Sequence, residues 1–310
     1  MGAVVVVAGP TASGKSSLAL ALADRFDGEI VNADSMQVYR EFSILTARPK
    51  PEDEARIRHH LYGVVPVATP CSAGLWLDHA VPIIEDMQIR RRLPIICGGT
   101  GLYLKVLKEG IAPVPDVAAD VIKNLTSLYE EIGGEAFRDR LTEHDPESAS
   151  RLEPGDRQRL IRAYGVASAT GRTLGEWQAE QGSEPPLDAK FFTIHLIPPR
   201  DRLYARIEER FDQMIEQGAL EEVRAVQAFD LDPDLPALKA LGVPDFQRYL
   251  TGEISLEDAV AKAKQNTRNF AKRQLTWFRN QSRADLVIED FGNAVAATIA
   301  EAAIVKLLGR

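Results

Sequence analysis

Hydrophobic positions in the first hundred residues alternate between short buried runs and longer helical stretches. A β-branched run at Val4–Ala8 predicts a strand, and leucines spaced among alanines predict a helix over Ser16–Arg25. The other elements expected here are strands at Glu29–Ser35, at His60–Val65 and from Leu93 to a break at Gly98, with a helix over Ser72–Arg92. Short strands that alternate with helices indicate βαβ units and a parallel sheet.

The pattern changes after Pro113. Residues 116–182 contain no convincing strand and predict short charged helices separated by glycine-rich breaks. A buried run at 190–199 predicts a return to the sheet. The remaining helices are expected at 200–228, 237–250, 255–281 and 294–308. We therefore expect an α/β core made of residues 1–115 and 183–310, interrupted by an all-helical insertion at 116–182.

Composition restricts the classes of function. The chain has 310 residues, 45% of them hydrophobic, which is enough for one large domain or two. Its formal net charge of −8 argues against indiscriminate nucleic-acid binding but leaves room for a local basic face. Cys71 and Cys97 lie far apart without metal-ligand partners nearby, so we expect neither a disulfide framework nor a zinc site. The apolar start, GAVVVVAG, is too short to span a membrane, and we expect a soluble, cytoplasmic protein.

A glycine-rich loop follows the first predicted strand. Residues 9–16 fit G-x-x-x-x-G-K-[ST] and precede a helix, which is the context that a phosphate-binding loop (P-loop) requires. Backbone N–H groups and the helix N-terminus can bind an anion, Lys15 can neutralise phosphate oxygens, and Ser16 can hold Mg²⁺. The pattern is specific for phosphate but not for the phosphate compound. The candidate diphosphate- or nucleotide-binding residues are Gly9, Pro10, Thr11, Ala12, Ser13, Gly14, Lys15 and Ser16.

Polar residues also follow the second and fourth predicted strands, at Asp34-Ser35 and at Gly98–Thr100. Ligands of parallel sheets bind at the carboxyl ends of the strands, where these residues should join the loop. Asp34 could hold Mg²⁺ through water at the end of an apolar strand, or act as a general base. It could equally cap a helix over the following residues.

Three segments concentrate cationic side chains. The first carries Arg202, Arg206 and Arg210 four residues apart on one predicted helix face. Like charges at this spacing repel each other unless an anion lies opposite them. The alternative is a solvated helix in which Glu208 and Glu209 pair with the arginines.

The second cationic segment, residues 261–283, contains seven Lys and Arg and no Asp or Glu, with Phe270, Trp277 and Phe278 interleaved. Such a face suits a nucleic-acid backbone, and its aromatic rings could stack on a base, although we expect these rings to lie mostly in the core. The third segment, 157–162, begins a helix with three arginines and a glutamine. It could contact RNA or form a charged surface helix.

Taken in order, seven segments of this chain resemble the tRNA dimethylallyltransferases, also called tRNA isopentenyltransferases. They are GPTASGKS, VNADSMQVY, TARP, CGGTGLYL, DRQRLIRA, RLYARIEERFDQM and AKRQLTWFRN, and the resemblance extends from about residue 3 to 280. It implies a P-loop NTPase-like parallel sheet flanked by helices. It also implies transfer of a dimethylallyl group from dimethylallyl diphosphate to N6 of adenosine at tRNA position 37, which gives N6-dimethylallyladenosine (i6A) and diphosphate.

The resemblance also implies roles for individual residues. Asp34 matches the family's proposed base, Thr100 lines the channel where the substrates meet, and Arg210 joins the loop in binding diphosphate with the help of Mg²⁺. The helical insertion corresponds to the part that grips the anticodon stem-loop. With Lys272 and Arg273 of the basic segment, the residues expected to contact tRNA are Asp34, Ser35, Met36, Gln37, Lys123, Gln158, Arg159, Leu160, Ile161 and Arg162.

The sequence departs from the family pattern at 41–48, at 122–123 and at 241–246, where it reads LGVPDF. It ends without the zinc-finger extension of eukaryotic relatives, so we expect a protein of the bacterial type, and a monomer. Two other classes stay open. One is a P-loop small-molecule kinase that uses ATP, which leaves the basic segment 261–283 without a task. The other is a nucleotide-switched RNA-binding protein without catalysis.

Overall fold

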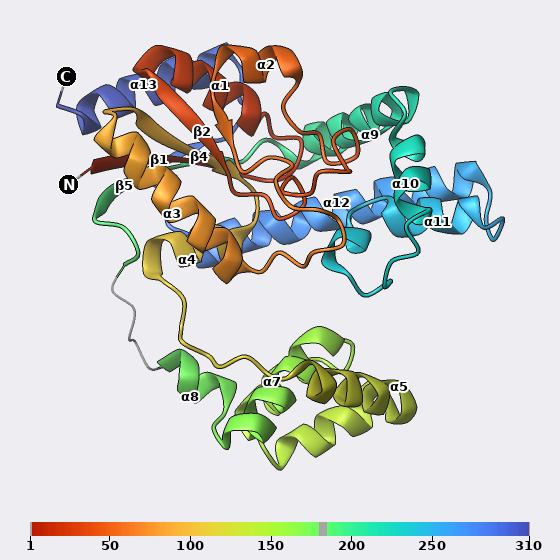
Figure 1. Ribbon diagram of the computed structural model, residues 1–310. Helices are drawn as coiled ribbons and strands as arrows, with labels where there is room; N and C mark the ends of the chain where they lie inside the picture. Colours follow the sequence, from red (N-terminus) through yellow and green to blue (C-terminus); the bar gives the residue numbers. More distant parts are fainter. Residues whose placement is uncertain (1, 180–184, 310) are drawn as a thin grey trace. The chain divides into compact units, whose positions relative to one another are not determined.

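The computed structural model describes residues 2–179 and 185–309 and divides the chain into two compact units (Figure 1). The first unit consists of residues 1–108 and 186–310, and the second of residues 109–185. The sequence placed the start of the insertion at 116. The second unit begins earlier, at Glu109, where the helix α4 (Gly101–Glu109) ends and Gly110 adopts a positive φ of 79°. The other predicted boundary, at 182–183, lies outside the described residues.

The first unit is built on a six-stranded parallel sheet of order β3-β2-β4-β1-β5-β6. Its strands are β1 (Gly2–Ala8), β2 (Gly28–Asn32), β3 (His59–His60), β4 (Leu93–Gly98), β5 (Ala189–Leu196) and β6 (Leu286–Ile288). The predicted α/β, P-loop NTPase-like fold is therefore confirmed. The register places Ala8 between Gly98 and His195, so three strands end together where the glycine-rich loop begins.

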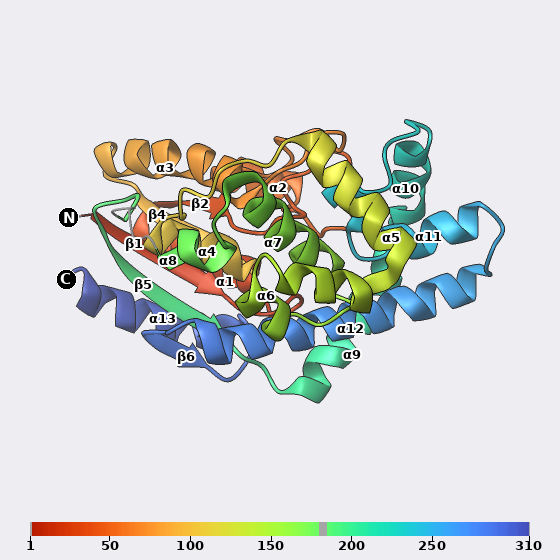
Figure 2. The same ribbon diagram turned by 90° about the horizontal axis from the view of Figure 1, so that it is seen from below.

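Helices cover both faces of this sheet (Figure 2). The helices α1 (Lys15–Phe26) and α13 (Ala294–Leu307) pack on Val5 and Val7 of β1. Val4 and Val6 face the opposite layer, which contains α3 (Ala73–Ile89), α4 and part of α12 (Leu256–Gln281). This double coverage explains why β1 is a continuous valine run instead of an alternating pattern, since each valine is fully buried.

The segment after β5 is helical and carries part of the site. It comprises α9 (Arg200–Glu216), α10 (Ala219–Gln227), a short 3-10 turn (Pro236–Lys239), α11 (Val243–Leu250) and α12. In Figure 1, α12 extends from beneath the sheet to α10 and α11. Glycines in the left-handed region, Gly218 (φ 103°) and Gly242 (φ 91°), split the two helices expected at 200–228 and 237–250.

A carboxylate from α10 fixes the segment 41–48, one of the departures from the family pattern. Glu222 accepts hydrogen bonds from the backbone N–H groups of Ser43, Ile44 and Leu45 at 2.8–2.9 Å, and from the Ser43 hydroxyl at 3.0 Å. Three converging N–H donors form an anion-binding concavity, which the side chain of Glu222 fills. This segment is thus anchored by an acid that lies far away in the sequence.

The second unit is helical in its described part and has its own apolar core. Its helices are α5 (Ala119–Thr142), α6 (Pro146–Arg151), α7 (Arg157–Thr170) and α8 (Leu174–Ala179). Gly133 (φ 78°) interrupts α5, so the glycine pair seen in the sequence marks a kink within that helix. Phe137 and Leu141 pack against Leu160, Ile161 and Ala163 of α7.

The structure differs from the sequence analysis in two strands, and it excludes one alternative that the sequence left open. The third strand spans only His59–His60, because Leu61 (φ 63°) and Gly63 (φ 61°) turn the chain where the prediction continued it. The strand β6 was missed, since three residues give no readable alternation. No helix follows Asp34, whose successors form turns.

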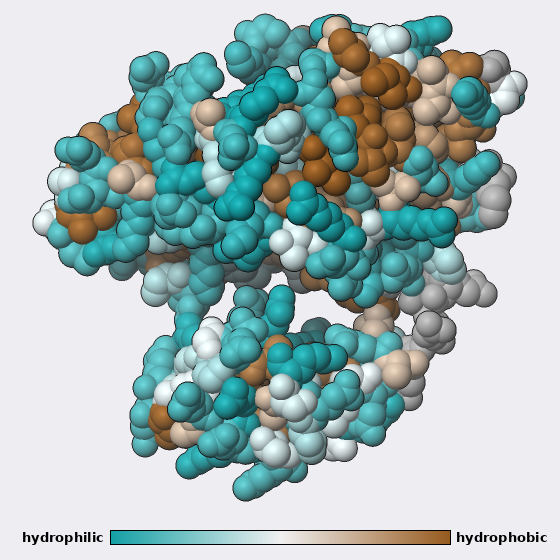
Figure 3. All heavy atoms as spheres, turned by 180° about the vertical axis from the view of Figure 1, so that it is seen from behind, coloured by the Kyte–Doolittle hydropathy of each residue, from teal (hydrophilic) through white to brown (hydrophobic). Residues whose placement is uncertain are grey.

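The outer surface of the first unit carries some exposed apolar side chains. Figure 3 shows hydrophobic residues gathered at its upper right. Among the C-terminal elements, Val287, Val295 and Ile299 are exposed, and Val295 reaches 67%. None of the described helices combines the length and the apolar character that crossing a membrane would need.

The close packing of Gly98 against Ala33 predicts that one methyl group added at Gly98 lowers the stability of the fold. A Cβ added to Gly98 would lie 2.1–2.2 Å from the carbonyl oxygen and carbon of Ala33, both backbone atoms that cannot rotate away. We expect Gly98→Ala to lower the free energy of unfolding by about 1–3 kcal/mol. Urea denaturation measures this free energy. Gly155→Ala, whose added Cβ meets nothing within 4 Å, serves as the control. Equal stability of the two variants would contradict this packing argument.

Candidate active site

The loop 9–16 is shaped to present backbone donors to an anion. Gly14 adopts a left-handed conformation (φ 86°) at the start of α1, and a Cβ there would lie 2.8 Å from the backbone nitrogen of Gly292. No side chain of the described residues caps α1, so its first N–H groups are available to a ligand. The buried hydroxyl of Ser13 has no hydrogen-bond partner among the described residues. The loop therefore has polar groups that an anion would satisfy.

Lys15 is the cation of this loop. Its Nζ donates to the backbone oxygen of Pro10 at 2.7 Å. Burial lowers the pKa of Lys15 to about 8, while the nearby Cys97 thiol and the Asp34 carboxylate act in the opposite direction. An anion in the loop would favour the charged form of Lys15.

Arg210 reaches the same loop from α9. Its Nη2 donates to the Thr11 hydroxyl at 2.6 Å. Burial and the neighbouring charge of Arg206 lower the pKa of Arg210 to about 10, so the guanidinium still carries its charge at neutral pH. The negative charge of Asp34 opposes that shift. Arg210 thus gives the loop a second cation.

The other arginines of α9 are held differently. Arg202 and Arg206 lie over the ring of Phe291, 5.2 and 4.8 Å from its centroid, and Arg202 also pairs with Asp290. Glu208 pairs with Arg268 of α12. Glu208 therefore pairs with an arginine of another helix. The alternative in which α9 neutralises its arginines with its own glutamates does not hold at this residue.

Asp34 follows β2 at the carboxyl edge of the sheet. Its Oδ1 accepts from the backbone N–H of Met36 at 2.9 Å, so the side chain stabilises a turn instead of capping a helix. The pKa values of Lys15 and Arg210 are both affected by its charge. One carboxylate and two cations therefore share this part of the site.

Thr100 is fixed against the turn that begins at Asp34. The Thr100 Oγ1 accepts from the backbone N–H of Ser35 at 2.9 Å and lies 3.2 Å from the Ser35 hydroxyl. The site therefore joins residues that follow three different strands. The sequence predicted this from the position of each segment after a strand.

Gln274 is a site residue that sequence reasoning missed. Its Oε1 accepts from the backbone N–H of Thr11 at 2.8 Å, and its Nε2 donates to the carbonyl oxygen of Gly99 at 2.9 Å. One nearly buried amide thus connects the loop after β1 to the loop after β4. The only sequence signal is a glutamine among the apolar positions of a basic helix, and this does not distinguish it from a surface residue.

The basic segment 261–283 forms most of α12. Lys272 and Arg273 are exposed, while Phe278 is buried. Trp277 lies against Gly101, where a Cβ would come within 2.4 Å of the indole ring. The cations therefore face outward and the aromatic residues at 277–278 pack inward.

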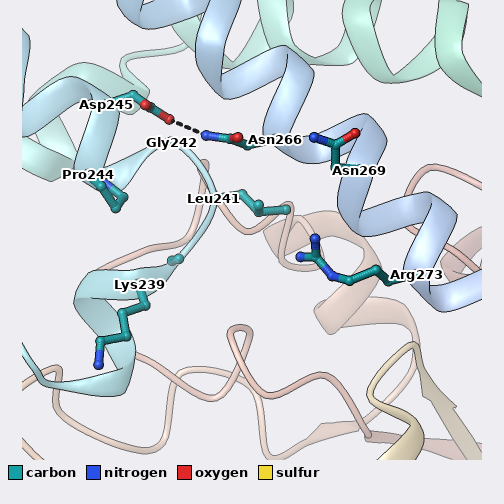
Figure 4. A pocket seen from close by; sticks show the side chains of 9 residues that line it. Lys239, Leu241, Gly242, Pro244, Asp245, Asn266, Asn269 and Arg273 are labelled. Atoms are coloured by element: carbon teal, nitrogen blue, oxygen red, sulfur yellow. Dashed lines mark hydrogen bonds between the residues drawn. The ribbon is translucent and has the colours of Figure 1, made fainter. Parts of the chain in front are cut away.

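A pocket lies beside α12, and the departure at 241–246 forms one of its walls (Figure 4). Pro244 and Asp245 lie in the first turn of α11, and Asn266 of α12 donates to Asp245 Oδ2 at 3.1 Å. The side chains of Asn269 and Arg273 continue the lining along α12. A polar surface therefore adjoins the exposed cations.

The second unit presents only part of its predicted RNA segment. Gln158 and Arg159 are exposed on α7, and Lys123 is exposed on α5. Leu160 and Ile161, which were included among the expected tRNA contacts, are 0% and 7% exposed in the core of this unit. Their side chains pack against α5 and α6, which corrects the expectation that they face a ligand.

Comparison with known proteins identifies the family. The family model "IPP transferase" matches residues 37–281, and "Isopentenyl transferase" matches residues 2–62. The chain is 50% identical to a tRNA dimethylallyltransferase of Rhodospirillum centenum over 281 residues, which cover 91% of this chain and 90% of that protein.

Two solved structures are also similar. A tRNA isopentenylpyrophosphate transferase of Staphylococcus epidermidis superposes with a TM-score of 0.69 at 30% identity, covering 100% of this chain and 99% of that one. A eukaryotic dimethylallyltransferase, described as acting on tRNA, gives a TM-score of 0.80 at 26% identity over 98% of this chain and 78% of that one. The chain therefore belongs to the IPP transferase family of tRNA dimethylallyltransferases.

Proposed function

We propose that this protein transfers a dimethylallyl group from dimethylallyl diphosphate to N6 of adenosine 37 in tRNA and releases diphosphate. The observation that carries the proposal is the convergence of three groups at the edge where the glycine-rich loop begins: Lys15 in the loop, Arg210, which donates to Thr11, and Asp34, whose charge acts on both cations. The transfer to tRNA is supported by a relative with 50% sequence identity that is named tRNA dimethylallyltransferase.

The loop and its cations suit a departing diphosphate. As the bond between the allylic carbon and oxygen breaks, negative charge grows on the leaving oxygen. The N–H groups at the start of α1, the Lys15 ammonium and the Arg210 guanidinium would stabilise that charge. Thr11 holds Arg210 in place through its hydroxyl. In this reaction the loop would stabilise a leaving group, whereas in a kinase it would stabilise a phosphoryl group during its transfer.

A divalent ion such as Mg²⁺ fits this arrangement only with help from the substrate. The described residues contain no cluster of three or more His, Cys, Asp or Glu side chains that could hold a metal. Mg²⁺ typically keeps several waters and binds one or two protein oxygens plus substrate phosphates. Ser16, whose side chain is exposed at the start of α1, would supply such an oxygen. The ion would add charge stabilisation to the leaving diphosphate.

Asp34 would serve as the base. The exocyclic amine of adenine is a weak nucleophile because its lone pair is delocalised into the ring. It loses a proton as the new carbon–nitrogen bond forms, and a carboxylate within reach can accept that proton. The adenosine must leave its stack to enter the site, as base-modifying enzymes require. Thr100 and the Asp34–Gln37 turn would line its path.

Two surfaces would bind the rest of the tRNA. One consists of Lys272 and Arg273 on α12, and the other is the polar part of the second unit, represented by Gln158, Arg159 and Lys123. Phosphate contacts of this kind supply affinity and place the target base.

Mass spectrometry of unmodified tRNA incubated with the protein, Mg²⁺ and dimethylallyl diphosphate tests the proposal. We expect a mass gain of one dimethylallyl group on an anticodon-loop adenosine. Asp34→Asn should lower turnover by about 10²–10⁴-fold, because an amide does not accept the proton, while tRNA affinity stays close to that of the wild type.

Other outcomes separate the alternatives. Transfer of phosphate from ATP, with dimethylallyl diphosphate inert, would establish the kinase. Unchanged biological function in the Asp34→Asn variant would favour the non-catalytic RNA-binding protein. Asp116→Asn, in the second unit, is the matched carboxylate control and should leave turnover unchanged.

The lowered pKa of Lys15 predicts how diphosphate binding depends on pH. The amine loses its proton as pH rises through about 8, so the loop loses a cation. The affinity for inorganic diphosphate should therefore fall by about tenfold between that pH and about pH 9.5. Titration calorimetry measures the affinity at each pH. Lys15→Arg keeps its charge throughout this range, and the ratio of wild-type to variant affinity isolates Lys15 from the ionisation of diphosphate itself. A ratio independent of pH would contradict the assignment.

The basic surface of α12 predicts the dependence of tRNA binding on salt. Replacing Lys272 and Arg273 by Ala should weaken tRNA binding and reduce the slope of log K against log salt by about 1–2, since two phosphate contacts are lost. Filter binding over a series of salt concentrations measures the slope. Lys306→Ala on α13 removes an exposed cation elsewhere and should leave the slope unchanged. An unaltered slope in the α12 variant would exclude this surface as an RNA contact.

A further inference from the structure

We infer that Gln274 is a positioning residue that couples the binding of the donor at the loop to the binding of RNA on α12. The inference rests on the proposed function, because it takes the loop 9–16 as the diphosphate site and Lys272 and Arg273 as RNA contacts. It adds a connection between the two sites.

Gln274 is bound at both ends of its amide. The acceptor oxygen holds the backbone N–H of Thr11, and the donor nitrogen holds the carbonyl oxygen of Gly99, at 2.8 and 2.9 Å. The side chain is only 6% exposed, so water does not readily replace either bond. A glutamate could keep the bond to the N–H but would lack the N–H donor that Gly99 needs.

Each end of this bridge leads to a group that the reaction uses. Thr11 accepts a hydrogen bond from Arg210 through its hydroxyl at 2.6 Å. Gly99 precedes Thr100, whose hydroxyl binds the Ser35 N–H next to Asp34. The bridge therefore connects the cation of the diphosphate site with the turn that carries the base.

The helix that supplies Gln274 also supplies the exposed cations. Lys272 and Arg273 directly precede it, and Trp277, one turn later, lies against Gly101. The helix thus contacts the loop after β4 through Gln274 and the start of α4 through Trp277. RNA bound to Lys272 and Arg273 would hold α12 in a fixed position. The Gln274 amide on the same helix would then be fixed as well, and with it the backbone of Thr11.

Coupling of this kind is reciprocal and can be measured as a ratio of affinities. Titration calorimetry would give the dissociation constant of inorganic diphosphate with Mg²⁺, alone and with saturating anticodon stem-loop RNA. We expect RNA to tighten diphosphate binding at least about fivefold in the wild type. In Gln274→Met, which keeps the volume but removes both hydrogen bonds, the ratio should fall below about twofold, while RNA affinity alone changes by less than about threefold.

Two further variants serve as a control and as a substitute for Gln274→Met. Thr267→Val, also buried on α12, removes a hydroxyl that bonds only the Ala263 carbonyl of its own helix, and it should retain the wild-type ratio. Should Gln274→Met fail to fold, Gln274→Glu tests the same bridge and should lower the ratio through loss of the bond to Gly99.

Three results would overturn the inference: a wild-type ratio near one, a Gln274 variant with the wild-type ratio, or equal loss in Thr267→Val. Failure of the proposed function is seen separately, as the absence of dimethylallylated tRNA from the wild-type reaction. The two failures are thus distinguishable.

Discussion

The active site depends on how closely the backbone of neighbouring loops can approach at the carboxyl edge of the sheet. Gly98 lies directly against the Ala33 backbone, and Gly14 lies against Gly292. In both places a single methyl group would meet main-chain atoms, which cannot move aside without moving a loop. The absence of side chains here allows the carboxyl ends of β1, β2 and β4 to place the P-loop, Asp34 and Thr100 within one site.

Long-range side chains then fix these loops. Gln274 holds the Thr11 N–H and the Gly99 carbonyl, Arg210 holds the Thr11 hydroxyl, and Glu222 holds the N–H groups of the segment at 43–45. Each comes from a helix that follows β5. The phosphate loop is therefore a local motif in the sequence, but its fixed geometry comes from residues about 200 or more positions away.

This division explains what the sequence could and could not predict. The strand β1, the loop and α1 are encoded by local rules, namely a buried valine run, glycine spacing and a helix start, and they were predicted with small errors at their ends. Asp34 and Thr100 were found because parallel strands place their carboxyl ends together. Gln274 and Glu222 were missed because nothing in their local pattern records a partner so distant in the chain. Leu160 and Ile161 were misassigned because a segment that contacts a ligand still alternates exposed with buried side chains along its helix.

Electrostatics explains how a loop typical of nucleotide-binding proteins can serve a different reaction. Backbone N–H groups and a lysine do not distinguish one diphosphate from another, so the chemistry must be set by what faces them. Here Lys15 is joined by a second cation, Arg210, and by the carboxylate of Asp34, whose negative charge favours the charged form of both cations. Burial weakens the charged form of both cations. A bound diphosphate would reverse that effect, because its negative charge favours the charged form of both cations. The donor would therefore complete the electrostatic environment in which Asp34, the proposed base, works.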